Sequence, residues 1–286
     1  MLKVDIVCPI YKDVEQIKTF IESLKNQENI LIENIIFAHT LSDTKIDNEI
    51  RNLINIENAK SFELEQNEFS HSLTRQKAVI EYCTSNIVIF CSQDIIFNDN
   101  HSIYNLAKNI NDDIVYAYGK QVCKYNSIEK YIREKNYGDT NIIVKKENIK
   151  DMQIMAFFAS DAFSAINRDV FIKLNGYQGY DVMMNEDQLY AKIILDNGYS
   201  KMYVSDAVVY HSHKYTLKQL YKRYYEAGKF YKTIKIFNEY KTNESGMKLA
   251  FYVLKCALKH FNLKVLVRWP FDMAARYLGM RKGKKN

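Results

Sequence analysis

The chain has 286 residues, of which 47% are hydrophobic and 26% charged, a balance that excludes a disordered protein. Its formal net charge of +6 is uneven, because residues 1–213 carry 22 Lys and Arg against 30 Asp and Glu, whereas residues 214–286 carry 18 against 4. A cationic end on an acidic body predicts an anionic partner such as nucleic acid, phospholipid or diphosphate. A solvated Lys-rich surface would give the same count.

Cysteine usage and hydropathy narrow the class further. The five cysteines form no C-x-x-C pair and lie mostly in apolar runs: Cys8, Cys83, Cys91, Cys123 and Cys256. This pattern indicates reduced core thiols and neither a disulfide framework nor a zinc site. The first residues lack the layout of a signal peptide, and no run of about 18 apolar residues offers a membrane span. We therefore expect a cytoplasmic protein.

The first hundred residues alternate between strand and helix patterns. The expected elements are strands at 4–11, 35–38 and 86–91 and helices at 14–24 and 73–82. The last strand is a continuous apolar run, which is typical of a strand buried on both faces of a parallel sheet. The alternation predicts an α/β, Rossmann-like fold with a mainly parallel central sheet flanked by helices.

The rest of the chain is less regular and ends in helices. The expected elements are a strand leading into a helix over 161–174, a helix over 185–197, a strand over 201–210, a long amphipathic helix from Thr216 and an apolar, basic stretch over 247–271. The tail, 281–285, is expected to be disordered. We predict a catalytic domain over 1–215, with a nucleotide-binding half (1–100) and an acceptor half (101–215), and a basic, amphipathic helical extension over 216–286.

Polar residues follow the predicted strands of the first half. In open α/β sheets, ligands bind outside the carboxyl ends of the strands. The residues found there are Tyr11 to Asp13, His39 to Asp43, and Ser92 to Asp94. A carboxylate such as Asp94 can hold a divalent cation that grips a diphosphate. Aspartate is also a common turn residue after a strand, so the position alone does not decide between the two.

Two further clusters carry groups suited to acid–base or metal chemistry. Glu186 and Asp187 begin a predicted helix, where carboxylates either complement the helix dipole or act as a general base beside an acceptor hydroxyl. His211 and His213 follow the strand that ends at Tyr210, and imidazole is a good ligand for Mn²⁺-like ions. Because alternate residues of an extended chain face opposite sides, we expect at most one of the two histidines to point into a site.

An arginine stands near the start of another predicted helix. Arg75 in the segment 69–75 can bind phosphate together with free backbone N–H groups, or be an ordinary surface residue. The motifs GxGxxG, GxxxxGK[ST], HExxH and GxSxG are absent from the sequence. Their absence argues against dinucleotide oxidoreductases, P-loop NTPases, zincins and α/β-hydrolases.

Taken in this order, the segments resemble glycosyltransferase family 2, the inverting enzymes with a GT-A fold, and within it the bacterial rhamnosyltransferases of O-antigen and capsule assembly. The resemblance spans roughly residues 1–230. The stretches that carry it are Cys8–Lys12, Phe69–Gln76, Ser92–Asp94, Ser164–Arg168 with Asn175–Tyr177, Asn185–Asp187 and Val209–Leu217. Two departures stand out: Gln93-Asp94 supplies one carboxylate where most relatives have D-x-D, and Ser72-Leu73 replaces Gly-Gly.

The resemblance implies a set of site residues and a mechanism. The implied residues are Pro9, Tyr11, Asp43, Arg75, Gln93 and Asp94 around the donor nucleotide, Asp161, Asn167 and Arg168 along the cleft, Glu186 and Asp187 at the catalytic position, and Asp94, His211 and His213 for Mn²⁺ or Mg²⁺. Asp187, more than Glu186, is the implied base that deprotonates the acceptor hydroxyl in a single displacement with inversion. The implied donor is dTDP-rhamnose, with galactose, glucose or galactofuranose donors as alternatives. The implied acceptor is a growing surface polysaccharide, commonly linked to polyprenyl diphosphate.

The cationic C-terminal part admits more than one partner. A basic amphipathic segment with Trp269 and Phe271 fits peripheral contact with the inner face of the cell membrane. Packing on the catalytic domain, or on the second subunit of a homodimer, fits it equally well. The acidic body and the lack of a recognised motif argue against nucleic acid. A non-catalytic glycan-assembly scaffold with the same fold is the alternative from another class, because the D-x-D motif is incomplete.

Overall fold

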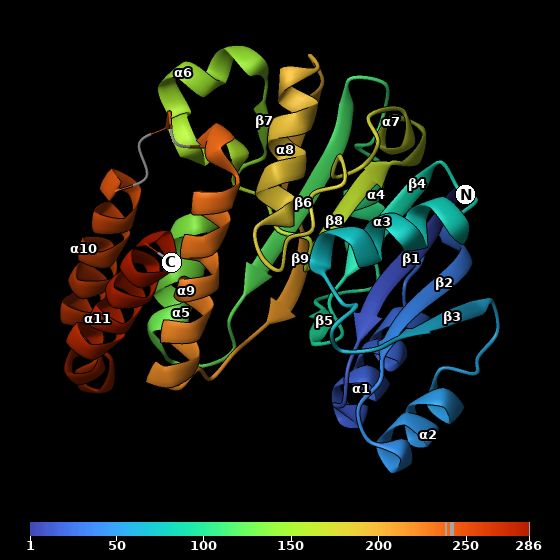
Figure 1. The fold of residues 1–286 in the computed structure, drawn as a ribbon, viewed down its shortest axis with the longest axis horizontal. Helices are drawn as coiled ribbons and strands as arrows, with labels where there is room; N and C mark the ends of the chain where they lie inside the picture. The colour runs from blue at the N-terminus through green and yellow to red at the C-terminus, as the bar shows by residue number, and fades with distance from the viewer. Residues whose placement is uncertain (238, 241–242, 286) are drawn as a thin grey trace.

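A computed structural model describes residues 1–237, 239–240 and 243–285. In this part of the chain nine strands form one sheet, in the order β3-β2-β1-β4-β8-β6-β9-β5 with β7 also paired to β9. The strands are β1 (Leu2–Ile10), β2 (Ile30–Thr40), β3 (Ala59–Leu64), β4 (Ile87–Cys91), β5 (Ile95–Phe97), β6 (Ile114–Val122), β7 (Ile142–Val144), β8 (Phe163–Asn167) and β9 (Ser200–His211). Figure 1 shows this sheet crossing the centre of the molecule.

Helices flank the sheet and then continue beyond it at the C-terminal end of the chain (Figure 1). They are α1 (Val14–Lys25), α2 (Thr44–Leu53), α3 (His71–Glu81), α4 (Ser102–Ala107), α5 (Ile128–Asn136), α6 (Ile149–Met152), α7 (Arg168–Lys173), α8 (Glu186–Asp196), α9 (Leu217–Thr233), α10 (Asn243–Lys259) and α11 (Leu263–Lys285). Short 3₁₀ helices lie at Lys146–Asn148, Gln153–Phe157 and Lys235–Phe237. The α/β fold with helices on a central sheet, predicted from the sequence, is confirmed.

The two halves of the sheet differ in strand direction. Strands β1, β2, β3 and β4 pair in parallel, whereas β8 lies antiparallel to both β4 and β6. The carboxyl ends of β1, β2 and β4 therefore meet at one edge of the sheet, where ligands bind in open α/β folds. Because β8 runs the other way, its last residues lie at the opposite edge.

The core fills both faces of the sheet. Ile6 and Cys8 of β1 point into a cluster with the apolar residues of α1 and α4, and Val7 between them points into a second cluster with α3 and α8. This alternation follows from the two-residue period of a strand. Strand β4 is buried along its whole length, which agrees with its uninterrupted apolar sequence.

The C-terminal helices pack tightly against one another and against α5. Glycines let α9 and α11 cross with their backbones in contact: a Cβ added to Gly228 would lie 2.5 Å from the Met280 carbonyl oxygen, and one added to Gly279 2.4 Å from that of Tyr221. The tail predicted to be disordered, 281–285, instead continues α11 to Lys285. The end of α11 is ordered because it packs on α9, where Gly283 is buried against Tyr225 and Gly228. Within the described residues, no helix is long and apolar enough to cross a membrane.

The cysteines are free thiols, as the sequence indicated. Cys8, Cys83, Cys91 and Cys123 are buried, and Cys256 on α10 is half-buried. Burial raises the pKa of the Cys8, Cys83 and Cys91 thiols above the ordinary value, with Cys91 adding to the effect at Cys8 and Asp5 at Cys83. These three thiols are therefore unreactive at neutral pH.

Candidate active site

A cavity of about 650 Å³ opens at the carboxyl ends of β1, β2 and β4. This volume lies within the range of small-molecule sites. Five residues predicted to contact the donor line it: Pro9, Tyr11, Arg75, Gln93 and Asp94. The other lining residues are Ile10, Gln16, Thr40, Gln66, Phe69, His71, Ser92, Met183 and Lys222. The parallel half of the sheet thus brings together residues from segments far apart in the chain.

Gln93 fastens the turn after β4 to the turn after β1. Its side-chain oxygen accepts from the Tyr11 N–H at 2.6 Å, and its amide nitrogen donates to the Tyr11 carbonyl at 3.0 Å. This pair of bonds holds the backbone of Tyr11 next to Lys12, which has a left-handed φ of 59°. Gln93 therefore shapes the wall of the cavity by holding the backbone of Tyr11 in place.

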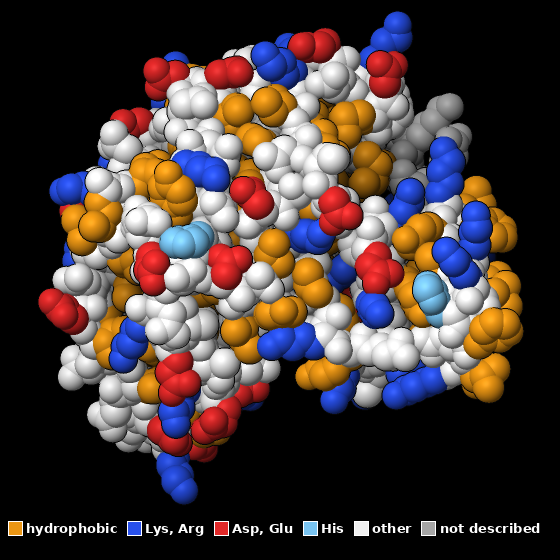
Figure 2. Space-filling view, turned by 180° about the vertical axis from the view of Figure 1, so that it is seen from behind, with side chains coloured by type: hydrophobic (Ala, Val, Ile, Leu, Met, Phe, Trp, Pro, Cys, Tyr) orange, Lys and Arg blue, Asp and Glu red, His pale blue; other side chains and the backbone are white. Residues whose placement is uncertain are grey.

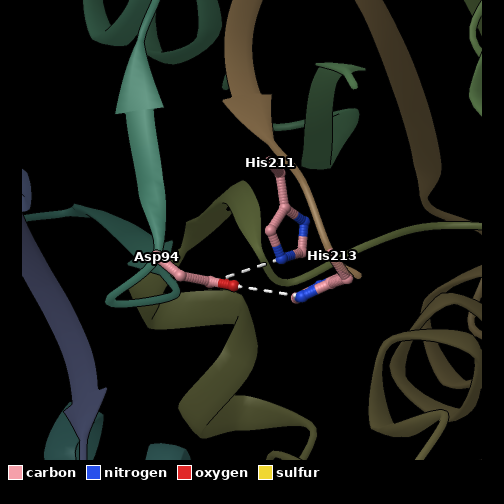
Figure 3. A group of neighbouring side chains, drawn as sticks. All are labelled: Asp94, His211 and His213. Atoms are coloured by element: carbon pink, nitrogen blue, oxygen red, sulfur yellow. Dashed lines mark ion pairs between the residues drawn. The ribbon is translucent and has the colours of Figure 1, made fainter. Parts of the chain in front are cut away.

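Asp94 lies between two imidazoles (Figure 3). Its carboxylate oxygens are 3.3 Å from Nε2 of His211 and 3.4 Å from Nδ1 of His213. One ligand atom from each of the three residues lies within 4.8 Å of the others. The expectation that at most one histidine points into a site is wrong. Strand β9 ends at His211, so the alternation of an extended chain no longer applies at His213.

A second hydrogen bond orients the His211 ring. Its Nδ1 lies 2.8 Å from Oε1 of Gln121 and 3.3 Å from the guanidinium of Arg133, while its Nε2 faces the Asp94 carboxylate. The Gln121 side chain is itself fixed, because its oxygen accepts from Arg133 and its amide donates to Ser160 at 2.6 Å. These contacts fix the direction in which the His211 ring presents Nε2.

Electrostatics keep this cluster in its ligand form at neutral pH. Burial raises the pKa of Asp94, but the His211 hydrogen bond and both imidazoles outweigh it and hold the pKa at about 2. Burial, then the neighbouring His211, lowers the pKa of His213 to about 4, and burial also lowers that of His211. An ionised carboxylate with two neutral imidazoles is a donor set that suits Mn²⁺.

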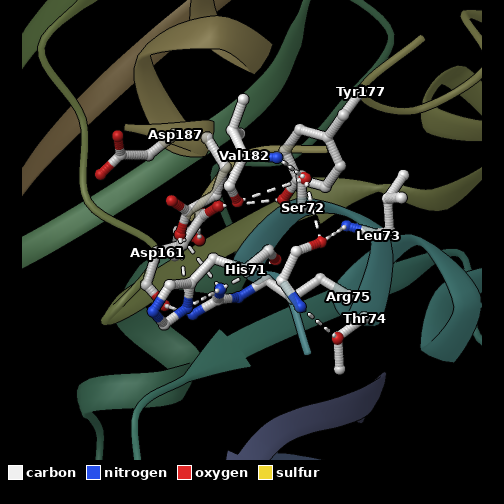
Figure 4. A network of polar contacts seen from close by, with 12 residues as sticks. His71, Ser72, Leu73, Thr74, Arg75, Asp161, Tyr177, Val182 and Asp187 are labelled. Atoms are coloured by element: carbon white, nitrogen blue, oxygen red, sulfur yellow. Dashed lines mark hydrogen bonds and ion pairs between the residues drawn. The ribbon is translucent and has the colours of Figure 1, made fainter. Parts of the chain in front are cut away.

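Arg75 forms the centre of a second, buried polar group (Figure 4). Its guanidinium donates to Oε1 of Glu186 at 3.0 Å and to the carbonyl oxygens of His71 and Asp161 at 3.1 and 3.3 Å. Helix α3 positions the arginine, since Ser70 caps this helix by accepting from the Leu73 N–H. The Nε of Arg75 is buried and has no partner among the described residues. Arg75 itself lines the cavity, so its positive charge lies at the cavity wall.

Asp161 is enclosed by hydroxyl groups and does not face open space. Its carboxylate accepts from Tyr116 at 2.7 Å, from Ser164 at 2.7 Å and from Tyr177 at 3.1 Å, and the residue is 2% exposed. Burial raises its pKa, and Arg75 partly opposes the rise. The carbonyl of Asp161 meets Arg75, so the residue braces the arginine. The expectation that it lines the cleft is wrong, because these hydroxyls occupy its carboxylate.

Asp187 stands in the first turn of α8, next to Glu186. In Figure 4 its carboxylate points away from Arg75. It accepts from the Gln188 N–H at 2.7 Å and is half-buried. Burial, followed by the charges of Glu186 and Asp161, raises its pKa well above that of an ordinary aspartate. It does not line the cavity described above.

Three predicted residues do not come to this site. Asn167 pairs with Ile87 at the first residue of β4, the opposite end from Asp94, and caps α7 by accepting from the Val170 N–H. Arg168 follows it at the same edge, with its N–H bonded to the Asn86 carbonyl. The expectation for both was wrong because β8 runs antiparallel to β4. Asp43 is exposed and caps α2, and Thr40 lines the cavity in its place.

Lys222 is the main residue that the sequence interpretation missed. It reaches the cavity from α9, a helix that we had assigned to the extension. The sequence places Lys222 on the polar face of the amphipathic helix that begins at Thr216. This pattern does not indicate whether the polar face meets solvent or a cavity. Phe69 and Met183 were also unassigned and supply apolar walls.

Solved structures identify the class of the fold. The chain aligns over 98% of its length with 86% of the mannosyltransferase PcManGT of Pyrobaculum calidifontis, with a TM-score of 0.63 and 11% identity. It aligns over 96% of its length with 79% of residues 1–349 of TarS from S. aureus, with a TM-score of 0.60 and 17% identity. Those structures contain GDP-Man with Mn²⁺ and UDP-GlcNAc, respectively. The chain has the GT-A fold of glycosyltransferases.

Sequence comparison gives the family. The sequence model of the family described as Glycosyl transferase family 2 matches residues 5–174, so the chain belongs to this family. It is 28% identical over 233 residues to the O-antigen chain rhamnosyltransferase RfbN of Salmonella typhimurium, covering 80% of this chain and 73% of that protein. It is 31% identical over 192 residues to the O-antigen chain rhamnosyltransferase WbaN of Salmonella anatum, covering 66% of this chain and 61% of that protein.

Proposed function

We propose that this glycosyltransferase transfers L-rhamnose from dTDP-rhamnose to a lipid-linked surface polysaccharide, with inversion at the anomeric carbon. The rhamnosyltransferase relatives support the donor. The observations that carry the proposal are that Arg75 and Asp94 of the histidine cluster line one cavity, and that Arg75 pairs with Glu186, the residue before Asp187. A group that holds diphosphate and a group that accepts a proton are thus coupled through a buried ion pair.

The chain's own residues bind and orient the donor. The turns held together by Gln93 and Tyr11 form the wall against which the nucleoside lies. Arg75 and Lys222 line the cavity and are the cations that meet the diphosphate and offset the negative charge that grows as it departs. Glu186 and two backbone carbonyls fix the Arg75 guanidinium beside the cavity.

The donor set of Asp94, His211 and His213 fits a divalent cation. Nε2 of His211 faces the ionised carboxylate of Asp94, and both groups are ligands of such ions. Two nitrogen donors favour Mn²⁺ over Mg²⁺, which prefers oxygen ligands. Such an ion supplies Lewis-acid stabilisation of the diphosphate when it is bound.

Asp187 is the proposed general base. Its raised pKa brings it closer to neutral pH, which improves proton transfer from an acceptor hydroxyl. The hydroxyl oxygen attacks the anomeric carbon, the bond to the diphosphate breaks, and the proton passes to Asp187. Glu186 has a different role in this proposal, because its carboxylate is engaged by Arg75 at 3.0 Å. It positions the arginine and raises the pKa of Asp187.

The test is turnover of a panel of nucleotide sugars. Wild-type protein with Mn²⁺ or Mg²⁺ and a synthetic polyprenyl-diphosphate-linked acceptor is expected to release dTDP from dTDP-rhamnose. Asp187→Asn is expected to bind this donor without turning it over. Turnover of a galactose, glucose or galactofuranose donor instead would overturn the rhamnose assignment. If no donor is bound or turned over, the transferase assignment fails and a non-catalytic scaffold is favoured.

The nature of the acceptor suggests where the protein acts. A polyprenyl-diphosphate acceptor is held at the inner face of the cell membrane, so an enzyme that extends it works at that face. We therefore propose peripheral association of a cytoplasmic protein with this membrane.

A further inference from the structure

The most exposed apolar side chains of the protein gather on the last two helices. Nine side chains of this region are more than half exposed: Met247, Phe251, Leu258, Phe261, Leu263, Val267, Phe271, Tyr277 and Leu278. Apart from Met1, every other large apolar side chain in the described residues is less than half exposed. Figure 2 shows orange side chains grouped at the right-hand edge of the molecule. We call the outer face of α10 and α11 the hairpin surface.

The spacing of these residues makes one stripe on each helix. Residues 247, 251 and 258 follow the helical period along α10, and residues 263, 267, 271 and 278 follow it along α11. The opposite faces are already used, because Val253, Ala257 and Val265 are buried in a cluster with Ile128 and Ile132 of α5. The exposed stripes are thus a second apolar face, which packing within the chain does not explain.

The charge of the hairpin surface has a single sign. Lysines flank the apolar stripes at positions 248, 255, 259 and 264, and basic residues continue at 281, 282, 284 and 285. From residue 246 to residue 285, Asp272 is the one acidic residue of the sequence. It is 2% exposed and paired with Arg276 at 2.6 Å. Between residues 246 and 285, no exposed side-chain carboxylate therefore interrupts the positive potential of this surface.

The hairpin surface is rigidly joined to the candidate active site. Arg276 of α11 donates to the Tyr224 hydroxyl on α9 at 2.6 Å and pairs with Glu129 on α5 at 2.5 Å. Helix α9 brings Lys222 to the cavity, and α5 carries Arg133, whose partner Gln121 orients His211. Whatever the hairpin binds is therefore held at a fixed orientation to the cavity.

We infer that the hairpin surface docks the protein on a bilayer that contains anionic phospholipids. Exposed Phe, Val and Leu side chains flanked by lysines are the composition of helices that lie in the membrane interface, with their apolar face in the headgroup region. A second copy of the chain suits the surface poorly, because a two-fold contact would place this cationic face against itself. The biological role of this docking rests on the proposed function, since a docked protein would present its cavity to a lipid-linked acceptor.

Vesicle sedimentation tests this directly. Wild-type protein is mixed with phosphatidylcholine vesicles, with or without phosphatidylglycerol, at several salt concentrations. We expect binding to the anionic vesicles that weakens with salt. The triple variant Lys255→Gln, Lys259→Gln, Lys264→Gln should bind about 100-fold more weakly, since each basic residue near such a surface contributes about five-fold. The apolar variant Phe251→Ser, Val267→Ser, Phe271→Ser should also lose binding.

Matched variants elsewhere separate the hairpin from general effects. Lys18→Gln, Lys25→Gln, Lys60→Gln removes three exposed charges from the other end of the chain, and Leu31→Ser, Ile80→Ser, Ile172→Ser removes three partly exposed apolar groups. Both should bind vesicles like the wild type. Equal binding to neutral and anionic vesicles, or wild-type binding by the hairpin variants, overturns the inference. So does a wild-type dimer that the apolar hairpin variant converts to a monomer, because the surface would then be a subunit interface.

A water-soluble acceptor separates this inference from the proposed function. With such an acceptor, the hairpin variants should turn over the donor as well as the wild type, because none of the substituted residues lines the cavity. Turnover without vesicle binding removes only the membrane inference. Vesicle binding without turnover of any donor by the wild type removes only the proposed function.

Discussion

Asp94 and Asp187 are two aspartates whose surroundings shift their pKa in opposite directions. Asp94 has imidazoles on both of its oxygens, and its pKa falls to about 2. Asp187 has the carboxylates of Glu186 and Asp161 as neighbours, and its pKa rises well above the ordinary value. Burial acts in the same upward direction on both, so the neighbouring groups decide the difference.

In the proposed mechanism, this difference suits each carboxylate to a distinct chemical task. A carboxylate that stays ionised is suited to hold a cation or to face the charge of a diphosphate, whereas one with a raised pKa is suited to accept a proton. Arg75 separates the two groups, since it lines the cavity with Asp94 and pairs with Glu186 beside Asp187. The predictions below test this division of labour.

The largest effect is expected from removing each charge in turn. Asp187→Asn should lower kcat about 10²- to 10⁴-fold, the usual contribution of a general base, and leave the Kd of the donor unchanged. Asp94→Asn should instead weaken Mn²⁺ and donor binding. Isothermal titration and nucleoside-diphosphate release measure the two quantities separately. If both variants lose binding and turnover in the same proportion, the two aspartates do not have separate tasks.

The link between the two sites should also stabilise the fold. Arg75→Met leaves Glu186 buried without its partner and should lower the free energy of unfolding by about 3–5 kcal/mol, as expected for a broken buried ion pair. Urea denaturation measures this. Arg51→Met is the matched control, because it breaks a pair with Glu63 that is exposed on both sides, and it should cost far less. Equal losses would show that burial of the Arg75 pair has no energetic importance.

The raised pKa of Asp187 predicts a particular pH dependence. The base works only when ionised, so kcat/KM should fall as the pH drops through this pKa, at a pH above the ordinary aspartate range. Glu186→Gln removes a neighbouring negative charge, which should lower the pKa of Asp187 and move the acidic limb of the profile to lower pH. Glu63→Gln, at an exposed glutamate, should leave the profile in place. An acidic limb that does not move in Glu186→Gln contradicts the coupling.

The smallest effect is expected at the edge of the sheet opposite the cavity. Asn167→Ala removes the cap of α7 and should lower the free energy of unfolding by about 1 kcal/mol, with kcat/KM unchanged. Asn167→Ser keeps a capping oxygen and should restore most of the stability. A loss of turnover in Asn167→Ala without a loss of stability would contradict its position far from the cavity.

The residues that the sequence singled out after the parallel strands line one cavity, for a physical reason. Tyr11, Gln93 and Asp94 follow strands that are clearly marked by apolar runs, and parallel strands bring their carboxyl ends to one edge. Asn167 and Arg168 were misplaced because sequence patterns locate a strand but not its direction in the sheet. His213 was misjudged because the strand ends at His211.

Contacts between distant segments were beyond the sequence pattern. No local signal indicates that Tyr116, Ser164 and Tyr177 surround Asp161, since these residues meet only when β6, β8 and the turn after α7 pack together. The order of α11 through Lys285 was missed for the same reason, because its lysine-rich composition is typical of a disordered tail. The glycines that seat it on α9, such as Gly283, act only across the interface.

The burial of the cysteines has a practical consequence. Three of the five thiols have raised pKa values within the core, and Cys123 is buried as well. Cys256 is the one thiol with partial access to solvent, and it lies on α10. A maleimide dye added to the native protein should therefore attach at this position without any cysteine being replaced. The fold thus provides a fluorescent reporter on the hairpin, whose emission would follow the arrival of the protein at a lipid surface in real time.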